Sequence, residues 1–281
     1  MARRSLLFAL LLLLGTMASA DESILVLARN GSAEEVLEAM RSGASMSERD
    51  VFGWTPLMLA AKWNDDLGVH QAMLRNGARV NVRSRDGWTP LLASARWNRN
   101  PRVMELLISR GADIEASSEE GWRALHWAAA GGRAEAVGLL IAAGADGNAR
   151  DNNGWTPLML ASLSRDAAIV SALLEAGADP NLQDSFGRTA LMRAAQNPNA
   201  SVTASLLEAG AAVNTSDRLG RTPILWAARY NDNPRVLELL EARGANILHR
   251  DESGEGLWEA IRDNRELAES EPYRRYRALG L

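Results

Sequence analysis

The chain has 281 residues, of which 47% are hydrophobic and none is cysteine, and its formal net charge is −4. This acidic balance argues against nucleic acid as the partner, because proteins that bind nucleic acid neutralise phosphates with an excess of Lys and Arg. The absence of cysteine excludes disulfides, a cysteine nucleophile and a lipid-modified N-terminal cysteine, so the fold depends on the burial of apolar side chains.

The first 20 residues have the three parts of a secretory signal peptide. Arg3 and Arg4 give a positive start, the apolar run 6–14 follows, and Ala-Ser-Ala at 18–20 supplies the small residues that a signal peptidase requires. The alternative is a membrane anchor, but this apolar run is much shorter than the about 20 residues that a membrane-spanning helix needs. We therefore expect cleavage after Ala20 and a periplasmic or secreted protein in a bacterial host.

Two series of glycines recur along the rest of the chain at a nearly constant period. In the first series successive loop glycines are 33 or 34 residues apart: Gly53, Gly87, Gly121, Gly154, Gly187, Gly220 and Gly254. In the second series a Gly-Ala pair begins ten residues before each loop glycine: Gly43, Gly77, Gly111, Gly144, Gly177, Gly210 and Gly244. Such a fixed period is the signature of a repeat protein whose units pack against their neighbours.

One repeat contains the signals for two short helices. Thr89-Pro90 supplies an N-cap residue followed by a proline at the first helical position, and Leu91 and Leu92 give this helix an apolar side. Asn100-Pro101 starts a second helix in the same way, and Gly111 suits the left-handed position after its C-terminus. Neither helix can bury its apolar face alone, so the repeats must stack.

Several segments of these repeats resemble the ankyrin-repeat pattern. They are Asp-Gly-Trp-Thr-Pro-Leu at 86–91, the segment 173–181, and the pair Ala128-Ala129. The family's Thr-Pro-Leu-His is retained only as Arg-Ala-Leu-His at 123–126, because the other repeats carry Met or Leu in place of the histidine. The resemblance implies an all-α solenoid of stacked helix–turn–helix units with β-turn fingers on one side.

This pattern divides the chain into four parts, and we expect the protein to be a monomer. The parts are a signal peptide at 1–20, an N-terminal capping repeat at 21–50, six ankyrin repeats at 51–250 and a C-terminal cap at 251–281.

The sequence shows no constellation of reactive groups that would indicate an enzyme, a cofactor or a metal site. Its three histidines, His70, His126 and His249, lie in different repeats, and His126 occupies the structural histidine position of the family. Asp151 to Gly154 is similar to the start of a calcium loop, but Ser162 stands where that loop needs a glutamate. We interpret Asp151 as part of a turn, because equivalent aspartates recur in other repeats.

Aromatic and basic residues recur at two positions that, by the resemblance, border the concave surface. One position follows the loop glycine and holds Trp54, Trp88, Trp122, Trp155, Arg188 and Arg221. The other ends the first helix of three repeats and holds Lys62-Trp63, Arg96-Trp97 and Arg229-Tyr230, each pair followed by an asparagine. Trp127, Trp226 and Trp258 are expected to be core residues instead.

Two interpretations of these residues remain open. The tryptophans after the loop glycines could stack on one another as a structural ladder, or they could form a binding surface, since interfaces are enriched in Trp and Arg. For Trp63, Trp97 and Tyr230 we favour binding. The sequence thus predicts a non-enzymatic, exported scaffold that binds a protein partner with acidic and apolar features through a concave aromatic and arginine groove. The alternative is a structural or stress-protective envelope factor with no dedicated groove.

Overall fold

The computed structural model describes residues 23–262, 264–270, 274 and 276, so the predicted signal peptide lies outside the described residues. The described residues form helices and no strand, and an isolated bridge joins Arg250 and Gly256. It forms two compact units, an N-terminal unit that ends at Ser118 and a C-terminal unit that begins at Glu119.

The described residues of the N-terminal unit, 23–118, form three helix pairs. Its helices are α2 (Ile24–Asn30), α3 (Ala33–Arg41), α4 (Pro56–Trp63), α5 (Leu67–Arg75), α6 (Pro90–Trp97) and α7 (Pro101–Ser109). The first helices α2, α4 and α6 pack side by side, and so do the second helices α3, α5 and α7. The first pair falls within the predicted capping repeat at 21–50.

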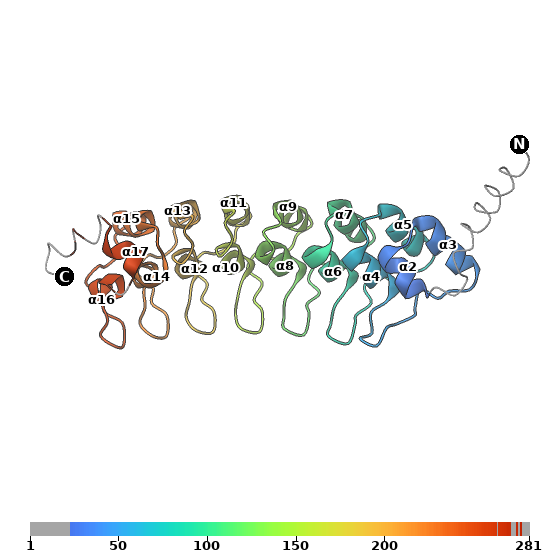
Figure 1. The fold of residues 1–281 in the computed structure, drawn as a ribbon, viewed down its shortest axis with the longest axis horizontal. Helices are drawn as coiled ribbons and strands as arrows, with labels where there is room; N and C mark the ends of the chain where they lie inside the picture. Colours follow the sequence, from blue (N-terminus) through green and yellow to red (C-terminus); the bar gives the residue numbers. More distant parts are fainter. Residues whose placement is uncertain (1–22, 263, 271–273, 275, 277–281) are drawn as a thin grey trace, which may run out of the picture. The chain divides into compact units, whose positions relative to one another are not determined.

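The C-terminal unit repeats this arrangement (Figure 1). Its helices are α8 (Ala124–Ala130), α9 (Ala134–Ala142), α10 (Pro157–Ala161), α11 (Ala167–Glu175), α12 (Ala190–Ala194), α13 (Ala200–Glu208), α14 (Pro223–Tyr230), α15 (Pro234–Ala242), α16 (Leu257–Arg262) and α17 (Arg265–Ala268). The first helices α8, α10, α12, α14 and α16 form one row, and α9, α11, α13 and α15 form a second. The loops that carry the first glycine series project beyond the row of first helices as fingers (Figure 1).

The helices begin where the sequence predicts. The Thr89 hydroxyl accepts a hydrogen bond from the backbone N–H of Leu92 at 3.2 Å, and Pro90 occupies the first turn. The Asn100 side chain caps α7 by accepting from the N–H of Arg102 at 3.1 Å. Between the two rows the core is apolar: Leu92, Val103 and Leu107 have no exposed surface.

The two glycine series are required for different reasons, although both adopt positive φ. Gly177 ends its helix at φ +88°, and a Cβ there would meet no atom within 4 Å, so only the left-handed conformation demands glycine. Gly154, at φ +78°, also lies close to the next finger, where a Cβ would come within 3.2 Å of backbone atoms of Asp184 and Ser185. The loop glycines therefore let successive fingers approach one another.

In several repeats an asparagine at the turn between the paired helices ties the repeat to the preceding one. The Asn98 amide donates to the backbone carbonyls of Ala61 and Asn64 at 3.1 and 3.0 Å. Asn231 donates in the same way to Ala195 and Asn197, both at 2.8 Å. The asparagine that follows the aromatic pair in the sequence is therefore a buried structural residue.

No helix among the described residues is both long and apolar enough to cross a membrane.

Candidate interaction surface

In the N-terminal unit, the two tryptophans that follow a loop glycine are packed side chains. Trp54 and Trp88 are only 7% and 8% exposed, and their rings stack 5.8 Å apart at an angle of 28°. Trp97, from the end of α6, lies 4.6 Å from the Trp88 ring and 6.1 Å from the Trp54 ring. Trp54 and Trp88 thus stack as the structural interpretation anticipated, and Trp97, for which binding was favoured, packs against both rings at a tilt.

Lys62 holds its ammonium group against three tryptophan rings. Its Nζ lies 4.3 Å from the ring centre of Trp97, 4.8 Å from that of Trp63 and 5.0 Å from that of Trp54. Burial lowers the pKa of Lys62, and repulsion by Arg29 and Arg96 lowers it further. The negative faces of the rings stabilise the cation.

Two arginines extend this arrangement on either side. The Arg96 guanidinium lies 4.6 Å from the Trp97 ring and 5.6 Å from the Trp88 ring, and that of Arg29 lies 5.7 Å from the Trp63 ring. Trp63 itself is 51% exposed. We call this set the tryptophan–cation cluster: Arg29, Trp54, Lys62, Trp63, Trp88, Arg96 and Trp97.

The sequence analysis missed Arg29, although the repeat period places it at the position of Lys62. The two residues are separated by 33 positions, and Lys62 and Arg96 by 34. The altered pattern of the first repeat, which lacks an aromatic residue after Arg29, concealed the match.

In the C-terminal unit, the corresponding tryptophans are half-buried and hydrogen-bonded or covered by arginine. The Trp122 indole donates from Nε1 to Asp151 Oδ2 at 2.9 Å, and its ring lies 4.2 Å from that of Trp127. The Trp155 ring has the Arg193 guanidinium at 4.0 Å and that of Arg188 at 5.8 Å.

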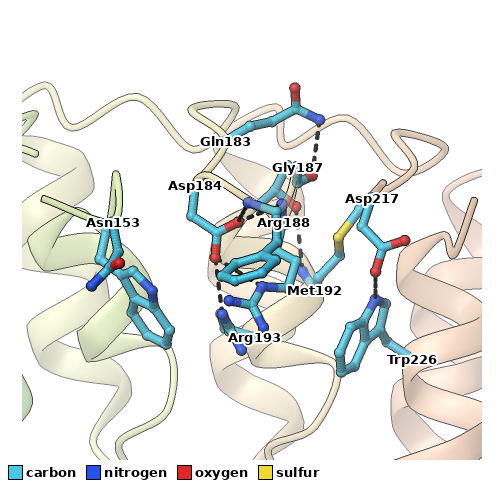
Figure 2. A network of polar contacts seen from close by, with 12 residues as sticks. Asn153, Gln183, Asp184, Gly187, Arg188, Met192, Arg193, Asp217 and Trp226 are labelled. Atoms are coloured by element: carbon cyan, nitrogen blue, oxygen red, sulfur yellow. Dashed lines mark hydrogen bonds and ion pairs between the residues drawn. The ribbon is translucent and has the colours of Figure 1, made fainter. Parts of the chain in front are cut away.

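Asp151 and Asp217, in two fingers of the C-terminal unit, each use both carboxylate oxygens. Asp151 Oδ1 accepts from the backbone N–H groups of Asn153 and Trp155, both at 2.8 Å, which is the turn chemistry that the sequence indicated. The Oδ2 atom of Asp217 accepts from the Trp226 indole at 3.0 Å, as Figure 2 shows. In these two fingers one carboxylate oxygen accepts from the backbone N–H groups of the turn, and the other accepts from a tryptophan indole.

The remaining predicted site residues lie near α14 and α16. The Arg221 Nε is 3.6 Å from Asp251 Oδ2, and Arg229 forms an ion pair with Glu255. Tyr230 is 49% exposed, and its ring lies 5.1 Å from that of Trp226. In contrast to Lys62, both arginines have carboxylate partners.

A protein-family model described as ankyrin repeats, in three copies, matches residues 24–118, 97–184 and 168–251. The chain belongs to the ankyrin-repeat family. Together with the helical architecture, this match shows an all-α ankyrin solenoid, as the sequence pattern predicted. A comparison with curated proteins finds no match to the chain.

Ankyrin repeats generally mediate protein–protein interaction, and proteins built from them are typically non-enzymatic scaffolds. The described residues hold no group of three or more His, Cys, Asp or Glu side chains arranged to bind a metal ion. The side chains that stand out in this ankyrin protein are instead aromatic and cationic.

The one retained ankyrin histidine, His126, has the structural role implied by the resemblance. Its Nδ1 accepts from the backbone N–H of Arg123 at 3.2 Å, and its Nε2 lies 3.1 Å from the carbonyl oxygen of Trp155. Burial is the main cause that lowers the pKa of His126. A neutral ring that accepts at Nδ1 and donates from Nε2 therefore links two repeats.

Of the three tryptophans expected in the core, only Trp226 is buried, with 9% exposure. Trp127 and Trp258 are half-buried. All three come from the first helices, as the repeat pattern placed them.

Proposed function

We propose that this ankyrin-repeat protein is an exported, non-enzymatic scaffold that binds a protein partner with acidic and apolar features. The observation that carries the proposal is the position of Lys62. Its ammonium group lies over three tryptophan rings, and none of the described carboxylates comes within ion-pair distance of it.

The tryptophan–cation cluster has the composition of an interface anchor. Trp63 is half-exposed, and the cationic groups of Arg29 and Lys62 both lie against its ring. Lys62 is partly desolvated and forms no ion pair among the described residues, which favours an acidic group on a partner, and charge complementarity also accelerates the encounter. Trp and Arg are the residues that most often dominate binding energy.

The predicted site residues contribute unequally to this proposal. Trp54 and Trp88 contribute packing rather than accessible surface, because their stacked rings are almost fully buried. Trp63, at 51% exposure, is the most exposed of the four tryptophans of the N-terminal unit. In the C-terminal unit Tyr230 has a comparable exposure, but the charges of Arg221 and Arg229 are already balanced.

Export is part of the proposal and rests on the sequence of residues 1–20. A positive start, a short apolar run and a small-residue cleavage site together support secretion to the periplasm or beyond the cell. The partner is then an envelope or extracellular protein.

The alternative is a structural or stress-protective factor, and the burial of Trp54 and Trp88 favours it. A stack of this kind stabilises the solenoid whether or not a partner exists. The exposure of Trp63 and the absence of an ion pair to Lys62 among the described residues have no role under this alternative.

Affinity capture from bacterial envelope extract with immobilised residues 21–281 distinguishes the two functions. A partner should be retained by the wild-type chain and lost with Trp63→Ala, whose exposed ring contributes little to the fold. Leu163→Ala is the matched control, because Leu163 is also an exposed apolar residue, at 45%, just after a first helix. If both variants retain the same proteins as the wild type, the tryptophan–cation cluster is not the binding surface.

A further inference from the structure

Asp184, Arg188 and Arg193 form a largely buried ionic group with one more positive than negative charge (Figure 2). Asp184 Oδ2 accepts from Arg188 Nε at 2.8 Å and from Arg193 Nη2 at 3.0 Å. The Asp184 side chain has no exposed surface, whereas those of Arg193 and Arg188 are 8% and 20% exposed. Among the described residues, no second carboxylate lies within 4.0 Å of either guanidinium.

The other oxygen of Asp184 is also fully used. Its Oδ1 accepts from the backbone N–H groups of Phe186 and Arg188 at 2.8 and 2.9 Å. One carboxylate therefore receives four hydrogen bonds, two of them from cations. It has no capacity left to neutralise the second arginine.

Other repeats show that the fold does not require this second cation. Trp226 occupies the same repeat position as Arg193, 33 residues later, and its neutral indole satisfies Asp217 Oδ2 at 3.0 Å. Trp122 satisfies Asp151 from the preceding finger. Burial lowers the pKa of Arg193, and repulsion by Arg188 adds to this effect. The repeat thus carries an electrostatic cost that its neighbours avoid.

The guanidinium of Arg188 is held in place before any ligand arrives. Its Nε is fixed on Asp184, and its Cζ lies 4.5 Å from the Phe186 ring and 5.8 Å from the Trp155 ring. Its two terminal nitrogens make no hydrogen bond within the described part of the chain. A planar fork that is already oriented binds a carboxylate with two parallel hydrogen bonds and loses little side-chain entropy in doing so.

We propose that Arg188 is the anchor for an acidic side chain of a protein partner, with Phe186 contacting an apolar residue beside that acid. This proposal rests on the proposed scaffold function but concerns a separate site in the C-terminal unit. One carboxylate matches the single excess charge, whereas a phosphate dianion would exceed it. A chain-terminal carboxylate is commonly bound by a nest of backbone N–H groups, and here Asp184 occupies those of the finger. Phe186 is 54% exposed, which leaves its ring accessible to an apolar neighbour.

Selection of a phage-displayed library of random peptides on residues 21–281 tests this site without knowledge of the partner. We expect the wild-type chain to enrich peptides that carry Asp or Glu beside an apolar residue. Synthetic peptides from that pool should lose about tenfold or more in affinity when the acid is replaced by its amide, or when the protein carries Arg188→Gln. Asp184 keeps Arg193 in the Arg188→Gln variant, so the buried ion pair remains.

Arg221→Gln is the matched control, because Arg221 occupies the same repeat position and already has Asp251 as a partner. It should leave the peptide affinity unchanged. Should Arg188→Gln fail to fold, Arg188→Lys still decides the matter, because it keeps the charge and removes the fork and should weaken binding.

The remaining outcomes are decisive as well. Absence of acidic enrichment on the wild type, or an affinity insensitive to Arg188, overturns the anchor and leaves the capture experiment at Trp63 unaffected. Conversely, acid binding that depends on Arg188, together with captured proteins that Trp63→Ala leaves unchanged, supports the anchor and removes only the tryptophan–cation cluster as a binding surface. Inorganic phosphate and acetate can each be tested as competitors of the bound peptide. If phosphate displaces the peptide at a lower concentration than acetate does, the site prefers phosphate and the choice of a carboxylate ligand is wrong.

Discussion

The ammonium nitrogen of Lys62 lies 4.3 Å from the ring centre of Trp97, whose ring is in turn 4.6 Å from that of Trp88. One indole therefore contacts both a partly exposed cation and a buried tryptophan. Trp97 thus links the partly exposed Lys62 to the buried Trp88. Its removal should affect both the stability of the fold and the position of Lys62.

The first prediction follows from this double contact. Trp97→Ala removes the tilted ring contacts with Trp54 and Trp88 and the ring nearest to the Lys62 ammonium group, and it should lower the free energy of unfolding by about 1–3 kcal/mol. Trp63→Ala, which removes a half-exposed ring, should cost about 1 kcal/mol or less. Urea denaturation of both variants measures the difference. Equal stabilities would show that the stacking of Trp97 contributes nothing to the fold.

The regular features of this ankyrin solenoid were predictable because they depend on local chemistry. A threonine followed by proline starts a helix wherever it stands, and a glycine at positive φ marks its own position in a repeat. The second series of glycines, the Gly-Ala pairs, therefore predicted where the second helix of each repeat ends without any knowledge of the packing.

The burial of individual tryptophans was not predictable, because it depends on the neighbouring repeat. Trp54 is covered by Trp88 and Trp97 from the next repeat, whereas Trp63 in the same repeat contacts Lys62 and Arg29 and remains 51% exposed. Arg193 escaped notice for a similar reason: in sequence it is one more basic residue on a helix, and only the structure shows its contact with Asp184.

A second prediction concerns the asparagines between repeats. Asn231→Ala removes two buried hydrogen bonds and leaves the carbonyls of Ala195 and Asn197 without this donor. Because an unsatisfied buried polar group is costly, the variant should lose about 2–3 kcal/mol of stability. Thermal or urea denaturation of the purified variant measures the loss.

Asn214→Ala is the control for this experiment. Asn214 also links two repeats, donating to Gly244 at 2.9 Å and accepting from Asn246 at 2.8 Å, but it is exposed. Water replaces the lost bonds there, so the cost should stay near about 1 kcal/mol. A cost for Asn214→Ala as large as that for Asn231→Ala would mean that burial does not set the value of these bonds.

A third prediction tests export. Protein recovered from the envelope fraction of an expressing bacterium should have the intact mass of a chain that starts at Asp21, because Ala18 and Ala20 supply the small residues that signal peptidase requires. Ala20→Phe should block cleavage and yield the mass of the full precursor. A wild-type mass that still includes residues 1–20 would identify the segment as an anchor.

The last prediction is a dependence of stability on pH that arises from buried histidines. His70 has no exposed surface, and its Nδ1 lies 2.9 Å from the carbonyl oxygen of Asp66. Burial lowers the pKa of His70 more than that carbonyl and the nearby carboxylates of Asp65 and Asp66 raise it. The unfolded chain, with an ordinary histidine pKa of about 6.5, therefore binds the proton more readily than the folded chain does.

The sign of the effect follows directly. Above pH about 6.5 both states hold a neutral ring, and stability does not depend on this residue. As the pH falls below that value, the unfolded state gains protons first and stability decreases, by at most about 1.4 kcal/mol per pH unit for each such histidine, until the folded pKa is reached. His126, whose pKa is also lowered by burial, adds a similar loss in the other unit. Urea denaturation at about pH 7.5 and about pH 5.5 should show a smaller decrease for His70→Leu than for the wild type. An equal decrease in both proteins would mean that His70 is protonated in the folded chain without cost.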